Sequence, residues 1–300
     1  MRVVVIGDAL IDELRDEGGI REFVGGAALN VAVGLTRFGV PTTLIAMVGD
    51  DEAGDHIRAY LADYGVELLA SPAPNGSSRA VSTRVDGEPV YGFNRAAQER
   101  AVVFGDAERA ACEDADLVVV SCFPFDAPDQ VRALADAVAD TPLAIDPNPR
   151  TGMMNDLEEF VRGFESVAAG AHLVKVGDDD ARLLYDAPLD ALRDRLVELG
   201  ADVVLATYGA AGAGLDTAGV AITAPISKLP GRIVDTMGAG DAVLSSIAAS
   251  VVQDSPEGED EWAAALHRAM DVAAATCRFE GALLRLPSAL ADADAAHYGS

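Results

Sequence analysis

Short apolar runs alternate with longer segments of helical spacing along most of the chain. The runs are rich in Val, Ile and Leu, as expected for strands that are buried on both faces. They cover Arg2–Ile6, Thr43–Val48, Leu117–Val120, Leu143–Ile145, His172–Val176 and Val203–Thr207. Helical spacing is found in Gly26–Phe38, Asp51–Tyr64, Ala127–Ala139, Leu157–Ala168 and Leu189–Leu199. This alternation predicts an α/β fold whose central sheet is mostly parallel and covered by helices on both faces.

The last third of the chain departs from this alternation. Gly212–Asp216 and Val220–Thr223 have the pattern of a hairpin, and two long Ala-rich helices are predicted at Ala239–Val252 and Glu261–Phe279. The chain therefore ends in a hairpin and a helix pair.

Two polar insertions, at about residues 11–24 and 79–103, have neither the length nor the apolarity of core strands. In the second, Ala80–Val85 and Pro89–Phe93 flank Asp86-Gly87, a dipeptide typical of tight hairpin turns. We expect the insertions to form a small β-lid. Since no internal repeat or linker occurs, residues 1–300 are predicted to be one domain that carries this lid.

Acidic residues dominate the charge: 49 Asp and Glu stand against 22 Lys and Arg, which gives a formal net charge of -27. Such a surface is repelled by nucleic acid and by anionic membranes, so neither is expected as a partner. The apolar share of 50% supports a sizeable core and argues against disorder. We interpret the acidity as the solvated surface of a halophilic protein, with a cation-binding surface as the alternative.

The three cysteines form no CxxC pair, which indicates a reducing compartment. The N-terminus has no pattern of a secretory leader, and no apolar stretch reaches the roughly 18 residues of a membrane span. We therefore expect a cytoplasmic protein.

The first strand ends in a Gly that is followed by acidic side chains. After Gly7 the sequence Asp-Ala-Leu lacks the further glycines of a dinucleotide-binding turn, which disfavours an NAD-dependent oxidoreductase. Asp8 and Asp12 remain at the edge where open α/β sheets bind ligands. The alternative is a solvated turn.

The segment GGAALNVAVGLTRFG, residues 25–39, places Asn30 one turn into an apolar helix. Asn is unfavourable inside helices because it competes for backbone groups, and a buried Asn needs partners. A polyhydroxy ligand could supply them. The alternative is a satisfied Asn near an ordinary helix N-terminus.

The segment DTMGAGDAVLSS, residues 235–246, exposes backbone N–H groups where a helix begins. The positive end of the helix dipole and the small residues Gly238, Ala239 and Gly240 suit an anion. Asp241 follows at once, and a carboxylate there can take a proton from an attacking hydroxyl. The alternative is an ordinary capped helix after a Gly turn.

Two later strand ends resemble phosphate-binding turns. Thr207, Gly209 and Gly212 follow one predicted strand, and Lys175, one of two lysines in the chain, lies near the end of another. No GxxxxGK[ST] motif occurs, so this is not a Walker loop. A hairpin turn and a surface lysine are the alternatives.

Taken together, these motifs resemble the ribokinase-like (PfkB family) carbohydrate kinases over nearly the whole chain. The two strongest matches are GGAALNVAVGLTRFG and DTMGAGDAVLSS, in this order and about two hundred residues apart. GDALID, YGFNRAA and DPNPR resemble weaker features of fructokinase-like members. The resemblance implies a three-layer α/β/α ribokinase-like fold with a small β-lid. Many members pair through their lids, so a homodimer is the favoured assembly.

The resemblance also implies a role for each matching residue. Asp241 would be the general base and Gly238, Ala239 and Gly240 the anion hole. The sugar would be bound by Asp12, Gly26, Asn30 and Arg95, and ATP by Lys175, Thr207, Gly209 and Gly212, while Arg150 could face either ligand. Mg²⁺ would accompany ATP, and K⁺ could bind near Asp235. The family's N-x-x-E motif reads Gly-Asp-Asp-Asp at residues 177–180, so Asp180 is only a candidate metal ligand.

The implied reaction is direct in-line transfer of the γ-phosphate of ATP to a sugar hydroxyl, without a phosphoenzyme. The motifs favour fructose or a related ketose, and 2-keto-3-deoxygluconate is the alternative substrate. A non-catalytic sugar-binding regulator is disfavoured because Asp241 is present.

Overall fold

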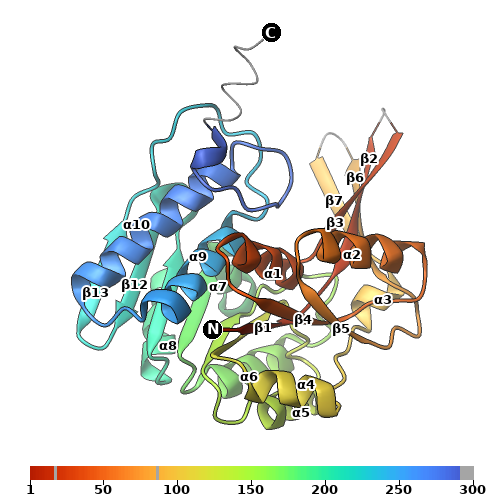
Figure 1. Ribbon diagram of the computed structural model, residues 1–300, viewed down its shortest axis with the longest axis horizontal. Helices are drawn as coiled ribbons and strands as arrows, with labels where there is room; N and C mark the ends of the chain where they lie inside the picture. Colours follow the sequence, from red (N-terminus) through yellow and green to blue (C-terminus); the bar gives the residue numbers. More distant parts are fainter. Residues whose placement is uncertain (17–18, 86–87, 291–300) are drawn as a thin grey trace.

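A computed structural model describes residues 1–16, 19–85 and 88–290, and its centre is a nine-stranded sheet (Figure 1). In spatial order the strands are β13 (Val220–Ala224), β12 (Ala213–Thr217), β11 (Val203–Thr207), β10 (Leu173–Gly177), β9 (Leu143–Asp146), β8 (Leu117–Ser121), β1 (Val3–Gly7), β4 (Thr42–Met47) and β5 (Glu67–Ser71). All neighbours are parallel except at β12, which runs antiparallel to β11 and β13. The expectation of a mostly parallel sheet is confirmed.

Helices cover both faces of this sheet. One face carries α1 (Ala27–Arg37), α2 (Glu52–Asp63), α9 (Ala239–Asp254) and α10 (Glu259–Thr276), and the other carries α4 (Asp106–Glu113), α5 (Pro128–Val138), α6 (Leu157–Ala168), α7 (Asp178–Tyr185) and α8 (Leu189–Glu198). Successive side chains of a strand point to opposite faces. In β1, Val3 and Val5 therefore pack with the first set of helices, and Val4 and Ile6 with the second. This double burial explains the continuous apolar runs.

Three elements escape the pattern of apolar positions. The edge strand β5 has the sequence ELLAS and is only partly buried, so it lacks a buried strand's signature. Helix α4 is short and mostly polar. Helix α7 opens with three acidic residues, at a strand end where the sequence predicts a phosphate-binding turn. Its start is stabilised by Asp180, whose carboxylate accepts a hydrogen bond from the amide of Gly177 at 2.7 Å.

The two polar insertions form a separate four-stranded sheet that projects from the large one (Figure 1). Its order is β3 (Gly19–Gly25), β2 (Leu10–Asp16), β6 (Ser78–Val85) and β7 (Glu88–Phe93). Strands β2 and β6 are parallel, and each is antiparallel to its other neighbour. The second insertion ends in a short helix, α3 (Arg95–Gln98), rather than in strand, and the predicted turn Asp86-Gly87 lies outside the described residues.

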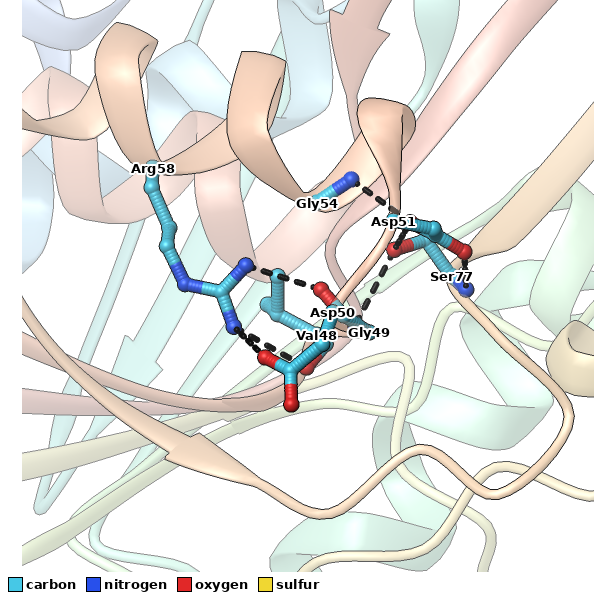
Figure 2. Close-up of polar contacts among 7 residues, drawn as sticks. All are labelled: Val48, Gly49, Asp50, Asp51, Gly54, Arg58 and Ser77. Atoms are coloured by element: carbon cyan, nitrogen blue, oxygen red, sulfur yellow. Dashed lines mark hydrogen bonds and ion pairs between the residues drawn. The ribbon is translucent and has the colours of Figure 1, made fainter.

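A joint of hydrogen bonds connects the small sheet to the N-terminus of α2 (Figure 2). The carboxylate of Asp51 accepts from the amide of Gly54 at 2.8 Å, from the amide of Ser77 at 2.7 Å and from the Ser77 hydroxyl at 2.6 Å. The Ser77 hydroxyl in turn accepts from the amide of Gly49 at 3.0 Å. Asn94, at the end of β7, donates to the Ser77 carbonyl at 2.9 Å. The base of the β6–β7 hairpin is thus fixed to the large sheet's loop after β4.

We expect Asp51→Ala to lower the free energy of unfolding by about 2 kcal/mol, because it removes both a helix cap and the bonds to Ser77. Partial burial opposes ionisation, but the hydrogen bonds from Ser77 and Gly54 lower the pKa of Asp51. A lowered pKa stabilises the fold above the unfolded value, so the difference between wild type and variant should shrink as pH falls below about 4. Urea titrations at several pH values measure it.

Asp50→Ala is the matched control, because the neighbouring Asp50 is fully exposed and only pairs with Arg58 at 3.1 Å. Its effect should stay within about 0.5 kcal/mol. Equal losses in the two variants would contradict the joint.

A hollow of about 710 Å³ lies beside this joint, between α2 and the segment that follows β5. Its lining includes Arg58, Ser71 and Pro74, and none of the predicted site residues. Arg58 is engaged there, since it donates to the carbonyl of Gly49 at 2.8 Å (Figure 2).

Among the described helices, none combines the length and apolarity that crossing a bilayer requires.

Candidate active site

The predicted site residues gather at the carboxyl ends of the parallel strands. After β1 the chain passes to β4 and β5 on one side, and later strands fill the other side from β8 onward. The strand order therefore reverses between β1 and β8, and open α/β sheets bind ligands at such a point. Asp8 follows β1, Asp146 ends β9, and Lys175 lies near the end of β10.

Helix α9 begins beside these strand ends with an uncapped first turn. Gly238 precedes it in a left-handed conformation with φ of 74°, and no side chain among the described residues caps the helix. A Cβ on Gly238 would lie 2.6 Å from the carbonyl oxygen of Ala282, so only glycine fits. The amide of Ala239 donates to the Thr236 carbonyl at 3.2 Å. Of the three predicted anion-hole residues, Ala239 is thus already engaged within the turn.

Asp241 lies in the first turn of α9 and is half-buried. Its carboxylate accepts a hydrogen bond from the Asn30 side-chain amide at 2.9 Å, across 211 positions of sequence. Burial raises the pKa of Asp241 to about 6; Asp146 adds to the rise, and the Asn30 bond and the charges of Lys175 and Arg150 oppose it. A carboxylate with this pKa is ionised at neutral pH and basic enough to accept a proton.

Lys175 and Asp146 form a buried ion pair next to α9. The ammonium donates to the Asp146 carboxylate at 2.8 Å, and the two side chains are 9% and 0% exposed. Burial opposes the lysine's charge, but the carboxylates of Asp146, Asp180 and Asp241 outweigh it and raise the pKa of Lys175. A Cβ on Gly240 would lie 3.1 Å from the ammonium nitrogen, which places this cation at the start of the helix.

The two candidate metal ligands have structural partners. Asp180 is buried behind its hydrogen bond to Gly177, and burial raises its pKa to about 7, with Lys175 opposing and Asp146 reinforcing the rise. Asp235 accepts from the amides of Met237 and Gly281, both at 3.0 Å. In the part of the chain that the structure describes, no group of three or more His, Cys, Asp or Glu could hold a metal ion.

Two acidic residues follow the first strand, and one of them, Asp12, lies within electrostatic reach of Asp241. Asp8 is buried and accepts from the amide of Ala28 at 3.0 Å, so it caps α1. Asp12, on β2, is half-buried, and burial together with the charges of Asp8 and Asp241 raises its pKa to about 6. Gly26 precedes α1 with φ of 111°, and a Cβ there would lie 2.8 Å from the Asp8 carbonyl oxygen. The backbone conformation and the close contact with Asp8 therefore require glycine at position 26.

The two predicted sugar-binding arginines differ in their surroundings. Arg150 is exposed. Desolvation opposes its charge, but nearby carboxylates, among them Asp241 and Asp8, outweigh desolvation and raise its pKa, so Arg150 lies within electrostatic reach of the acidic residues. Arg95, on α3, is 73% exposed and pairs with Glu99 at 2.9 Å. The structure brings Arg150 to the other site residues and leaves Arg95 engaged elsewhere.

The predicted nucleotide turn follows β11. Thr207 donates from its hydroxyl to the Val176 carbonyl at 3.3 Å, and Gly209 opens a short 3₁₀ helix, η1 (Gly209–Ala211), with φ of 53°. A Cβ on Gly212 would lie 2.1 Å from the carbonyl oxygen of Ala224. Gly212 is thus explained by hairpin packing, and Thr207 lies against β10 near the start of α7.

Two buried residues of the site were not predicted individually. Asp146 was noted only within the DPNPR motif, although an acid that directly follows a buried apolar run is the signal that finds it. Arg100 is buried and donates to the carbonyls of Cys122 at 3.2 Å and Met153 at 2.8 Å. The sequence carries no signal for Arg100, because its acceptors are backbone atoms of distant segments.

Gly25→Ala should displace the Asp12 carboxylate while leaving the fold intact. A Cβ on Gly25 would lie 2.2 Å from Oδ2 of Asp12, and the side chain must move because this contact is impossible. Asp12 is a predicted sugar ligand, and loss of its charged hydrogen-bond acceptor should raise the KM for the predicted sugar substrate at least about tenfold. Steady-state kinetics beside thermal melts measure this, with Gly92→Ala as control, since its Cβ meets open space. A Gly25→Ala variant with wild-type KM would contradict the assignment of Asp12.

The chain is similar to known proteins over most of its length. The sequence profile described as "pfkB family carbohydrate kinase" matches residues 2–289. A fructokinase of Rhizobium leguminosarum bv. trifolii is 30% identical over 84% of the chain and 80% of its own length. An ATP-dependent 6-phosphofructokinase of Thermoanaerobacterium thermosaccharolyticum is 24% identical over 95% of the chain and 90% of its own length. The crystal structure of a Xylella fastidiosa fructokinase with bound ATP superposes with a TM-score of 0.82 at 20% identity, covering 100% of this chain and 99% of that one.

Proposed function

The chain belongs to the pfkB family of carbohydrate kinases, and from this premise we propose that it transfers the γ-phosphate of ATP to a hydroxyl of fructose or a related neutral ketose. The observation that carries the proposal is the contact between Asn30 and Asp241 at the uncapped start of α9. One segment supplies a polar group for a sugar, and the other supplies a base and a positive helix end.

In this proposal Asp241 takes the proton from the sugar hydroxyl as that oxygen attacks the γ-phosphorus in line. The bond between the γ-phosphorus and the β–γ bridging oxygen breaks, and ADP leaves with that oxygen. The start of α9, with the Lys175 ammonium beside it, stabilises the charge that develops on the phosphoryl oxygens. Asp12, Asn30 and Arg150 orient the sugar. The small sheet acts as the lid that excludes water from the reaction.

The residues present fit a Mg²⁺ ion that accompanies ATP. Oδ1 of Asp146 is buried and has no hydrogen-bond partner among the described residues. The charge of Asp146 helps to raise the pKa of Asp180, so the two carboxylates are within electrostatic reach of each other. Mg²⁺ keeps several waters and takes one or two carboxylates plus substrate phosphates, so a cage of three protein ligands is not needed. When bound, the ion neutralises phosphate charge.

The candidate K⁺ ligand, Asp235, does not fit that role in the same way, because both of its carboxylate oxygens already accept hydrogen bonds from amides.

The charges near Asp241 support a neutral substrate. Asp8, Asp12 and Asp241 are three carboxylates. Of the nearby cations, Lys175 is paired with Asp146, the guanidinium of Arg100 is engaged by carbonyls, and Arg150 is exposed. An additional negative charge on the sugar would be repelled by more than about 1.4 kcal/mol, or roughly tenfold in kcat/KM. The competing substrate is 2-keto-3-deoxygluconate, and the observation in its favour is Arg150, which could pair with a sugar carboxylate.

An ADP-release screen in molar KCl tests the proposal with fructose, 2-keto-3-deoxygluconate, fructose 6-phosphate, ribose and nucleosides side by side. We expect the highest kcat/KM for fructose or another neutral ketose. A higher kcat/KM for 2-keto-3-deoxygluconate would select the competing substrate. If none of these compounds causes ADP release, the sugar-kinase proposal is rejected.

Pairing of two copies through the small sheet is a further part of the proposal. The edge strand β3 exposes Ile20 (64%) and Phe23 (37%), which a partner would cover. Light scattering of the wild type and of Ile20→Glu measures the assembly, and a monomeric wild type would contradict it.

A further inference from the structure

On the basis of the proposed function, we propose that Asp146 is a positioning residue that holds Lys175 against the start of α9, where its ammonium meets the transferred phosphoryl group. Lys175 would touch substrate, and Asp146 would act through Lys175 by way of Oδ2, the oxygen that accepts from the ammonium. Oδ1 of Asp146 stays the candidate Mg²⁺ ligand. Neither the family match nor the names of the relatives assign Asp146 a role.

The pair is set by the register of the sheet. Strands β9 and β10 are parallel, with Ala144 opposite Leu173 and Ile145 opposite Val174. The next positions along the two strands are Asp146 and Lys175, so their side chains emerge at the same level. The 2.8 Å contact therefore follows from strand pairing and fixes the otherwise flexible lysine.

Gly240 provides the room for this lysine. The backbone of Gly240 does not need glycine, since it lies in a regular helix and its φ is not positive. Its missing side chain matters because a Cβ would lie 3.1 Å from the Lys175 nitrogen. Glycine at this position thus leaves the ammonium in contact with the first turn of α9, where an anion would bind.

Fold stability does not explain the pair. Buried ion pairs often contribute no more than apolar residues of the same volume, because two charges must be desolvated. Oδ1 of Asp146 additionally lacks a hydrogen-bond partner among the described residues, and so does the hydroxyl of Ser121, which lies opposite Asp146 across β8 and β9. Unsatisfied buried polar groups are rare in native proteins, and they concentrate where function requires them.

The test compares Asp146→Asn, Lys175→Met and the double variant Asp146→Leu/Lys175→Met with the wild type. Each single variant should lower kcat by about 10²–10³-fold, as expected for loss of one charge-stabilising donor, and leave the KM for the sugar within about twofold. The double variant should regain thermal stability, because no unpaired charge stays buried, but should regain no turnover.

A second readout is independent of turnover. Calorimetric titration should show that the wild type binds a non-hydrolysable ATP analogue more tightly than ADP, and that Asp146→Asn loses this difference. Arg195→Met is the control, since Arg195 on α8 forms an ion pair with Glu165 on α6 at 2.9 Å and, within the described part of the chain, contacts none of the candidate site residues.

Wild-type kcat in Asp146→Asn, or a double variant that regains activity together with stability, would overturn the positioning role. These outcomes are distinct from failure of the proposed function, which would appear as a wild-type protein that releases no ADP with any sugar.

Discussion

Asp241→Asn is expected to lower turnover by about 10²–10⁴-fold, the range that a general base contributes, while sugar and ATP still bind. The substitution keeps the shape of the side chain and an oxygen that can accept the hydrogen bond from Asn30. It removes only the ability to take the proton from the sugar hydroxyl. The effect should therefore appear in kcat, with little change in KM.

Single-turnover kinetics with the preferred sugar, combined with calorimetric binding, separate these effects. Asp254→Asn is the matched control at the other end of the same helix, because Asp254 is exposed and pairs with Arg268 at 2.7 Å. That variant should retain wild-type turnover. Near-wild-type turnover in Asp241→Asn would remove the general-base assignment.

Lowering the pH from 7 to 5 should reduce kcat/KM steeply, by up to about 100-fold for each pH unit below 6. Burial raises the pKa of both Asp241 and Asp12 to about 6, so the two carboxylates that we propose for base catalysis and sugar binding become protonated in the same range. Protonation of one essential carboxylate lowers kcat/KM about tenfold for each pH unit below its pKa, and protonation of two lowers it about a hundredfold.

The effect of protonation on stability distinguishes this loss of activity from unfolding. A carboxylate whose pKa is raised on folding stabilises the folded state below its unfolded pKa and loses that contribution as pH rises through the folded value. Protonation of Asp12 and Asp241 near pH 6 therefore does not unfold the protein. Thermal melts at each pH should confirm this while activity falls.

The slope of the profile is the diagnostic measurement. In Asp12→Asn the acid limb should fall with a slope of one instead of two, because only Asp241 still titrates. A wild-type profile that stays flat down to pH 5 in a folded protein would contradict the raised pKa of Asp241.

The sequence predicted the layers of the fold because each buried strand must be apolar on both faces. Elements with little buried surface gave no such signal, as the edge strand β5 and the acidic start of α7 show. The joint at Asp51 was invisible for another reason. Its bonds connect segments that only the folded chain brings together, and the glycines around it are fixed by neighbours: a Cβ on Gly49 would lie 2.7 Å from the amide nitrogen of Ser77.

The candidate site was partly predictable from the same physics. Asp241 and Asn30 are both conspicuous, one beside bare glycines and the other inside an apolar helix, and they prove to be in contact. The pairing of Lys175 with Asp146 depends on which strands become neighbours. The contact of Arg95 with Glu99 depends on a short helix that follows the hairpin and that the sequence did not predict. Local patterns specify neither.

The contact between Asn30 and Asp241 has a consequence for the newly synthesised chain. A ribosome that has released only the first two hundred residues has already delivered Asp12 and Asn30, but not the helix that carries the base. A truncated product that ends before α9 is therefore unable to transfer phosphate, whatever it binds. Under the proposed mechanism, activity therefore begins only once translation has delivered α9.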